Sequence, residues 1–482
     1  VYRGEKARPV QISIWYPAKK RSTLPRMSYV DYLLKVVNET DFAIPDKAAK
    51  QAFLLKWKQD YERRKIPVDV LIELLSEKMN AVENAEASAG PFPLILYAAS
   101  INSSPYENLF LFEYLASHGY IVAAVPSNGR HSGIMTMDWE GSNAQVDDLA
   151  FVLAYMKSDS TVDFERIGAL GFSWGGLAVS QLAVKNHLID GTVCLDGGVR
   201  FGFDGNRWKN YPYYRSDKLR SPFMLMSSRG YREATRKDFI SRIKYAPVFH
   251  LNYPFLQHSK FCSADHQIRL GWIRKQMTDK VNPLNRKKLR RDFNAGKYPT
   301  QILNDRIIRS YELLCFYTGA FFDWVLKDDP KGQAVVFRGP ARNGYPAELV
   351  QYQANAALPV PPNQAEFIQI MQRKPGGLTE AKRLFLELRK KDPELKIFSE
   401  AYMNNLGYRL LHGNRIDEAI SVLELNAIAY PNSANVYDSL GEAYAAGKAY
   451  QKAIRSYQRS LELDRTNANA VKMLRKLKGK DD

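Results

Sequence analysis

One serine stands inside a run of glycines at Gly171-Phe172-Ser173-Trp174-Gly175-Gly176. The apolar segment before it, RIGALGF at residues 166–172, is typical of a buried β-strand, and a helix is predicted to begin near Gly176. Glycines on both sides allow the sharp, strained turn that a direct step from strand to helix requires. Such a turn would lift the Ser173 hydroxyl above the end of the sheet.

Strands and helices alternate on both sides of this motif. An alternating segment predicts an opening strand at residues 9–17, and short apolar runs predict strands at 93–99, 120–125, 166–172, 192–195, 222–226 and 247–251. Helices are predicted at 109–118, 146–156 and 306–326. Continuous apolar strands separated by helices indicate a mostly parallel sheet with helices on both faces. The α/β-hydrolase fold places a G-x-S-x-G motif at this strand-to-helix position, so we predict that fold.

A helical insertion is predicted over about residues 24–90. Residues 48–64 form an amphipathic pattern with three aromatic residues four apart on one face, Phe53, Trp57 and Tyr61. Residues 68–79 predict a second helix. Amphipathic helices usually cover core surface, and a lid over the site or a surface that contacts lipid is the alternative.

A proline-rich stretch at residues 357–362, ALPVPP, marks a domain boundary. Such a stretch propagates neither helix nor sheet and behaves as a semi-rigid spacer. We therefore expect an α/β-hydrolase domain at residues 1–345, a linker at 346–365 and a helical domain at 366–482.

The C-terminal domain repeats with a period of 34 residues. The matching pairs are Leu406-Gly407 with Leu440-Gly441, Gly413 with Gly447, Ala419-Ile420 with Ala453-Ile454, and Ala434 with Ala468. This is the period of tetratricopeptide repeats, whose small residues allow close contact within each helix pair. We predict roughly two and a half such repeats and a surface for a protein or peptide partner. An unrelated helical bundle is the alternative.

The chain is basic, with 69 lysines and arginines against 51 acidic residues and a formal charge of +18. The densest basic run, residues 286–291, has no nucleic-acid-binding fingerprint around it. We expect a solvated surface there, with contact to a membrane surface or another polyanion as the alternative, and no nucleic-acid partner. Three cysteines without metal-ligand spacing, Cys194, Cys262 and Cys315, predict neither a disulfide framework nor a metal site.

The sequence contains no apolar run long enough to predict a membrane-spanning helix. It begins at Val1 rather than methionine, which suggests either a removed leader or a trimmed chain. We expect an exported protein, periplasmic or secreted, and a cytoplasmic location stays open.

A serine nucleophile needs a histidine base, which follows it in the usual order serine, acid, histidine. His258 follows the predicted strand at 247–251 and a short connection, where the fold places its base, and is the first candidate. His266 lies further on in a polar loop. His250 lies inside the strand-like run, where a packed core histidine is the simpler interpretation.

The acid that orients this histidine is predicted to be Asp196. In most α/β-hydrolases it follows the second strand after the nucleophile, but no carboxylate follows residues 222–226 before Glu233. Asp196 ends the preceding strand and is followed by two glycines that can turn the chain. A turn-capping role for Asp196 is the alternative.

The domain resembles the secreted platelet-activating-factor acetylhydrolase family, relatives of the dienelactone hydrolases. The resemblance spans about residues 8–330 and rests on five segments: residues 14–17 (IWYP), 115–125 (LASHGYIVAAV), Gly171 to Gly176, Leu195-Asp196, and His258 with Phe261. It implies a calcium-independent, lipase-like esterase whose acid follows the strand just after the nucleophile, in agreement with Asp196.

The loop that supplies the second oxyanion donor departs from that family. The family has a Ser-His-Gly-Leu context there, whereas this chain has Tyr97-Ala98-Ala99-Ser100-Ile101-Asn102. The backbone N–H of Ile101 would be the donor, together with that of Trp174. Backbone donors survive replacement of side chains, although the missing glycine affects the path of the loop.

We therefore predict a serine esterase with Ser173 as nucleophile, His258 as base and Asp196 as acid, which needs no metal or organic cofactor. Its expected substrates are short-chain acyl or lipid-like esters, which implies a role in lipid degradation. A serine peptidase would use the same residues. A catalytically decayed hydrolase that acts as a protein-binding scaffold through its repeats is the alternative from another functional class.

Overall fold

The computed structural model describes residues 9–19, 24–39, 47–63, 75–76, 78–131, 133–200, 215–228, 239–265, 305–373 and 375–478. The chain divides into two compact units, Val1–Ala357 and Leu358–Asp482. None of the described helices is long and apolar enough to cross a membrane.

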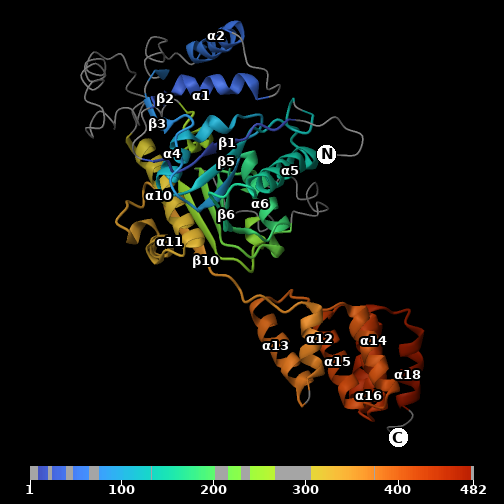
Figure 1. Ribbon diagram of the computed structural model, residues 1–482. Helices are drawn as coiled ribbons and strands as arrows, with labels where there is room; N and C mark the ends of the chain where they lie inside the picture. Colours follow the sequence, from blue (N-terminus) through green and yellow to red (C-terminus); the bar gives the residue numbers. More distant parts are fainter. Residues whose placement is uncertain are drawn as a thin grey trace. The chain divides into compact units, whose positions relative to one another are not determined.

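An eight-stranded sheet forms the centre of the first unit (Figure 1). Its strands, from one edge to the other, are β1 (Ser13–Trp15), β5 (Ile121–Val125), β4 (Phe92–Ala98), β6 (Val162–Phe172), β7 (Ile189–Leu195), β8 (Phe223–Ser228), β9 (Val248–Tyr253) and β10 (Gln351–Asn355). The six strands from β5 to β9 are parallel to one another. The edge strands β1 and β10 run antiparallel to their neighbours.

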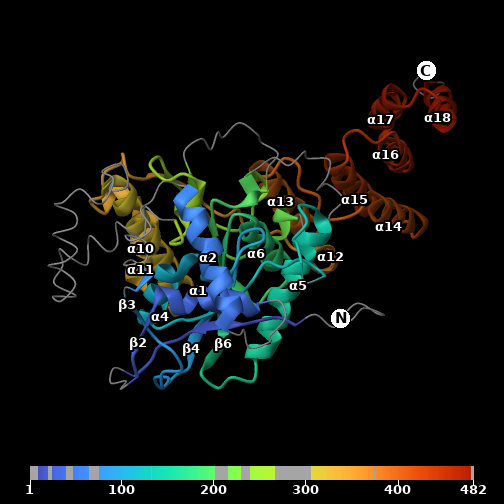
Figure 2. The ribbon, with the colours of Figure 1, turned by 90° about the horizontal axis from the view of Figure 1, so that it is seen from above.

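Helices cover both faces of the sheet. The helices α4 (Leu109–Ser117) and α10 (Asp305–Lys327) contribute to one core, and α5 (Trp139–Met156) and α6 (Trp174–Lys185) contribute to the other. Figures 1 and 2 both show α10 and the pair α5 and α6 on opposite sides of the strands. Side chains alternate across β4, so Ile95 and Tyr97 enter the first core while Leu94 and Leu96 enter the second. The mostly parallel α/β-hydrolase sheet expected from the sequence is therefore present.

The predicted helical insertion also contains strands, which corrects the prediction. It holds α1 (Tyr29–Lys35) and α2 (Lys47–Arg63), but also β2 (Arg26–Ser28) and β3 (Lys78–Val82), which pair antiparallel. The end of the helix predicted at 68–79 thus belongs to a strand, and residues 64–74 lie outside the described residues. β3 is favoured by tertiary contacts, since the backbone N–H groups of Asn80 and Ala81 donate to Glu113 of α4.

Part of the linker predicted at 346–365 belongs to the sheet instead, because residues 351–355 form β10. This strand extends the sheet beside β9, and its second residue, Tyr352, donates from its hydroxyl to the carbonyl of Val336. Val336 belongs to α11 (Pro330–Arg342). Four of the five β10 residues are exposed, so the strand lacks the apolar signal on which the prediction relied.

The second unit contains only helices among its described residues. They are α12 (Gln364–Gln372), α13 (Gly377–Lys391), α14 (Glu400–His412), α15 (Ile416–Ala429), α16 (Ala434–Ala446), α17 (Tyr450–Leu463) and α18 (Ala468–Lys478). The pair α14 and α15 recurs as α16 and α17 with both starting residues shifted by 34 (400 to 434, 416 to 450). A Cβ on Gly407 would lie 2.6 Å from the Leu423 side chain, and one on Gly441 would lie 2.8 Å from Tyr457. These glycines therefore permit the close contact within each pair.

Six short 3₁₀ helices complete the described elements. They are η1 (Val36–Asn38), η2 (Pro105–Asn108), η3 (Gly198–Arg200), η4 (Ser216–Lys218), η5 (Ile240–Arg242) and η6 (His258–Phe261). Two of them, η2 and η6, lie beside the candidate site.

Candidate active site

Ser173 forms the sharp turn between β6 and α6. Its backbone has φ 54° and ψ −117°, a conformation that L-residues adopt only when the surrounding structure imposes it. The flanking glycines are required by close contacts, since a Cβ on Gly171 would lie 2.3 Å from the carbonyl oxygen of Gly175. A Cβ on Gly175 would lie 2.1 Å from the carbonyl oxygen of Ala98. The motif therefore packs the turn directly against the end of β4.

Backbone hydrogen bonds join this turn to the end of β7. The N–H of Ser173 donates to the carbonyl of Leu195 at 2.9 Å, and the N–H of Gly198 donates to the carbonyl of Ser173 at 2.8 Å. A Cβ on Gly176 would lie 2.8 Å from the Cα of Gly197. The serine turn and the segment that carries Asp196 are consequently held in one fixed arrangement.

Three side chains predicted as a catalytic set form a continuous hydrogen-bonded chain. Ser173 Oγ lies 2.8 Å from His258 Nε2, and His258 Nδ1 lies 2.6 Å from Asp196 Oδ2. With the proton on Nδ1, the imidazole donates to Asp196 and its Nε2 accepts a hydrogen bond from the serine hydroxyl. This geometry allows His258 to take the proton of Ser173.

Asp196 is buried, with 1% of its side chain exposed. Its backbone has φ 42°, and its N–H donates to the carbonyl of Met226 in β8. Asp196 Oδ1 accepts the N–H of Ser228 at 2.7 Å, which leaves Oδ2 directed at His258. An ionised carboxylate in this position orients the imidazole and stabilises its charged form.

His258 begins η6, which follows β9 after a tight turn. Its ring packs against Phe172 with centroids 5.1 Å apart, while 47% of its side chain remains exposed. The carbonyl of Phe261, at the end of η6, accepts a hydrogen bond from the Asn108 side chain. The base is thus reachable by substrate while its loop is attached to the protein core.

Of the other residues considered for this site, His250 is the one that the structure describes. His250 lies on β9, and its Nε2 is 2.7 Å from the hydroxyl of the buried Ser227 rather than near Ser173. His266, Glu233 and the basic run at 286–291 lie outside the described residues. Among the described residues, no three histidine, cysteine, aspartate or glutamate side chains come together in a way that could hold a metal ion.

The two predicted oxyanion donors lie on different elements. Trp174 is the first residue of α6, directly after the serine, where backbone N–H groups point out of the helix N-terminus. Ile101 lies in the loop after β4, whose carbonyl at Ala99 accepts a hydrogen bond from Gln145. The Ala98 carbonyl approaches Gly175 of the serine turn, so this loop starts beside the nucleophile.

Comparison with known proteins adds a partial family match. The dienelactone hydrolase family model matches residues 115–209. No curated protein matches the sequence. Among solved structures, a ferulic acid esterase from Streptomyces cinnamoneus aligns with 20% identity and a TM-score of 0.45, covering 72% of this chain and 89% of that chain. The sheet order and the dienelactone hydrolase match together support an α/β-hydrolase.

The dienelactone hydrolase match includes Ser173 and Asp196 but ends before His258. It also leaves out Ile101 and Glu107, a buried glutamate that contacts the loop after β4. The sequence around Glu107 carries no specific signal, because acidic residues are common near the start of helices for electrostatic reasons alone. Only the folded chain shows that this carboxylate faces inward.

Proposed function

We propose that this protein is a serine esterase that hydrolyses carboxylic esters through an acyl-enzyme. The observation that carries the proposal is the hydrogen-bonded chain from Ser173 through His258 to the buried Asp196. The order serine, acid, histidine along the chain and the strained turn at Ser173 support the same function.

The proposed reaction has two acyl-transfer steps. Ser173 Oγ attacks the ester carbonyl while His258 Nε2 takes its proton, and that proton is then delivered to the leaving alcohol oxygen. Water next attacks the acyl-serine with His258 as base, which releases the carboxylic acid and restores Ser173. Asp196 stabilises the imidazolium that forms in each step.

The negative charge on the carbonyl oxygen needs hydrogen-bond donors in both steps. We assign this role to the backbone N–H groups of Trp174 and Ile101. Their positions, at the start of α6 and in the loop after β4, support the assignment. Because both donors belong to the backbone, the alanines of this loop are compatible with it.

The experiment that tests the proposed function is labelling with a fluorophosphonate probe. Covalent labelling at Ser173, abolished by Ser173→Ala, is the expected result, because only an activated serine reacts. A folded protein that remains unlabelled would support the non-catalytic scaffold. A labelled protein that also cleaves peptide bonds would support the peptidase.

For the substrate class we propose short-chain or lipid-like esters, on the resemblance to the acetylhydrolase family. Hydrolysis of p-nitrophenyl esters from acetate to palmitate measures this preference. The expected maximum lies at short acyl chains, and a clear maximum at long chains would contradict it.

The helical unit is proposed to be a tetratricopeptide-type array that binds a protein or peptide. The shift of 34 residues between its two central helix pairs supports this assignment.

A further inference from the structure

We propose that Glu107 is a positioning residue, whose buried carboxylate holds the loop after β4 so that the Ile101 N–H faces the reacting carbonyl oxygen. The proposal rests on the proposed esterase function and concerns how the second half of the oxyanion site is built. Glu107 lies on η2, directly after this loop.

The Glu107 carboxylate contacts the chain on both sides of Ile101. Its Oε1 accepts hydrogen bonds from the Tyr97 hydroxyl at 2.7 Å and the Ser100 N–H at 2.8 Å. Its Oε2 accepts the Ser100 hydroxyl at 2.6 Å and the Ser103 hydroxyl at 2.7 Å. The segment between Ser100 and Ser103 thus curves around one side chain, and Ile101 lies within that curve.

These four contacts compensate the burial of the Glu107 carboxyl group. Glu107 is buried, and this burial raises the pKa of its carboxyl above the usual value, although the hydrogen bonds from Ser100, Tyr97 and Ser103 act in the opposite direction. Each of its two oxygens has two hydrogen-bond partners, and one of these partners, the Ser100 N–H, is a donor whatever the protonation state of the carboxyl. No lysine or arginine in the described part of the chain forms an ion pair with it, so hydrogen bonds from the loop compensate its burial.

The backbone of η2 is attached to the segment that follows the catalytic histidine. The carbonyl oxygen of Glu107 accepts the N–H of Ala264 at 2.9 Å and the hydroxyl of Ser263 at 3.3 Å. The neighbouring Asn108 donates to the carbonyl of Phe261. One short helix therefore contacts the oxyanion loop through the Glu107 side chain, and it contacts the histidine segment through the Glu107 carbonyl and the Asn108 side chain.

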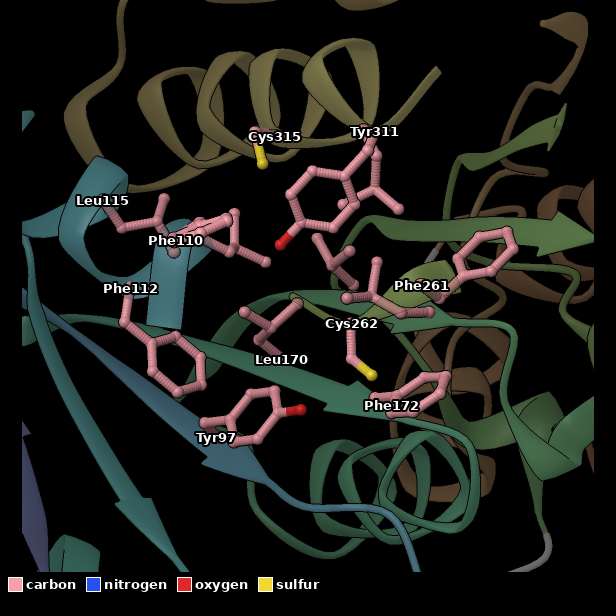
Figure 3. Close-up of a cluster of buried hydrophobic side chains, with 14 of the residues drawn as sticks. Tyr97, Phe110, Phe112, Leu115, Leu170, Phe172, Phe261, Cys262, Tyr311 and Cys315 are labelled. Carbon is pink, nitrogen blue, oxygen red and sulfur yellow. The ribbon is translucent and has the colours of Figure 1, made fainter. Parts of the chain in front are cut away.

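Two tyrosines of a packed core cluster form hydrogen bonds with this short helix. Figure 3 shows Tyr97, Phe172, Phe261, Cys262 and Tyr311 gathered between the sheet and α10. The Tyr311 hydroxyl donates to the Asn108 side chain at 2.8 Å. The hydroxyls of Tyr97 and Tyr311 therefore connect Glu107 and Asn108 of η2 to the packed core.

The ratio of hydrolysis rates for an ester and its thiono analogue tests this role. The analogue carries sulfur in place of the carbonyl oxygen, and sulfur accepts hydrogen bonds from the oxyanion donors poorly. The parent should therefore favour the oxygen ester strongly. Glu107→Gln should lower kcat for the oxygen ester by about 10²-fold, the effect typical of a lost oxyanion donor, with little change in KM. The kcat for the thiono ester should fall far less. The ratio of the oxygen-ester rate to the thiono-ester rate should therefore be smaller in Glu107→Gln than in the parent.

Glu113→Gln is the matched control. Glu113 is a second buried glutamate of the same domain, and it accepts hydrogen bonds from Asn80, Ala81 and Tyr32 rather than from the oxyanion loop. Its substitution should lower thermal stability while leaving the ratio of the two esters unchanged. A purely structural role for Glu107 would give the same result as this control.

Should Glu107→Gln fail to fold, the double variant Ser100→Ala/Ser103→Ala replaces it, because it removes two donors and keeps the carboxylate. The double variant should also lower the ratio of the oxygen-ester rate to the thiono-ester rate. A folded, active variant with the parental ratio of rates would overturn the role proposed for Glu107 and would leave the proposed esterase function standing. A parent protein that neither labels with fluorophosphonate nor hydrolyses esters would instead overturn the proposed function, and this inference with it.

Discussion

Asp196 shows how a single side chain is prepared for its proposed role. One carboxylate oxygen accepts the Ser228 N–H and the other faces His258, so neither oxygen is available to water. Asp196→Asn should keep the fold and lower turnover by about four orders of magnitude, because the amide favours the wrong histidine tautomer and cannot stabilise the imidazolium. Steady-state hydrolysis of an activated ester measures the loss.

The control for this substitution is Glu233→Gln, which should leave turnover nearly unchanged. In Ser173→Ala, turnover should fall at least as far as in Asp196→Asn. The assignment of the acid would be wrong if Glu233→Gln abolished hydrolysis while Asp196→Asn stayed within about tenfold of the parent.

Glu39 is a residue whose titration should change stability. Burial raises the pKa of its carboxyl from 4.5 to about 7, although the Ser104 hydroxyl donates to it. The folded state therefore prefers the protonated form, so the stability linked to Glu39 is complete below pH 4.5 and is lost as the pH rises through 7. The side chain introduced by Glu39→Gln cannot ionise. The unfolding free energy of this variant, relative to that of the parent, should therefore rise by about 2 kcal/mol from pH 5 to pH 8.

Urea unfolding of parent and Glu39→Gln at both pH values measures this difference. Equal differences in unfolding free energy at pH 5 and pH 8 would show that Glu39 ionises normally in the folded protein.

At the scale of elements, the close approach of α6 to β4 is the most constrained contact of the site. Gly175→Ala would place a Cβ 2.1 Å from the Ala98 carbonyl oxygen, so the serine turn and the loop after β4 must separate. We expect a loss of about 3 kcal/mol or more in unfolding free energy, together with loss of ester hydrolysis. Chemical denaturation and a rate assay on the same sample measure both effects.

Gly133→Ala is the matched control, since a Cβ there meets no atom within 4 Å. It should leave stability within about 0.5 kcal/mol of the parent. If Gly175→Ala kept the stability and activity of the parent, the turn would have space for a Cβ at this position, and the close contact with Ala98 would not constrain the site.

At the scale of the whole molecule, the boundary between the units decides which truncations fold. A chain that ends at Ala357 keeps β10 beside β9 and should retain its esterase turnover. A chain that ends at residue 345, the boundary predicted from the sequence, loses β10 and leaves β9 as an open edge, so we expect aggregation. Size-exclusion chromatography and ester hydrolysis distinguish the two.

If the chain ending at Ala357 were folded but inactive, the helical unit would be part of the catalytic machinery. Equal behaviour of the two truncations would show that β10 contributes little to the sheet.

The sequence alone predicted the parallel sheet, the strand-to-helix turn at Ser173 and the set Ser173, Asp196 and His258 that the structure brings into hydrogen-bond contact. These features leave local signals, because buried parallel strands are continuous apolar runs and a strained turn needs glycine. The 34-residue period of the helical unit can also be recognised directly in the sequence, and the same shift separates its two central helix pairs.

Tertiary structure decided what has no local signal. β10 is short and exposed, and β3 is held by Glu113, so their strand conformation depends on partners distant in sequence. The inward-facing carboxylate of Glu107 is stabilised only when Tyr97, Ser100 and Ser103 converge on it. A pattern along the chain records which residues tend to be buried, but the hydrogen bonds that compensate a buried charge exist only after the chain has folded.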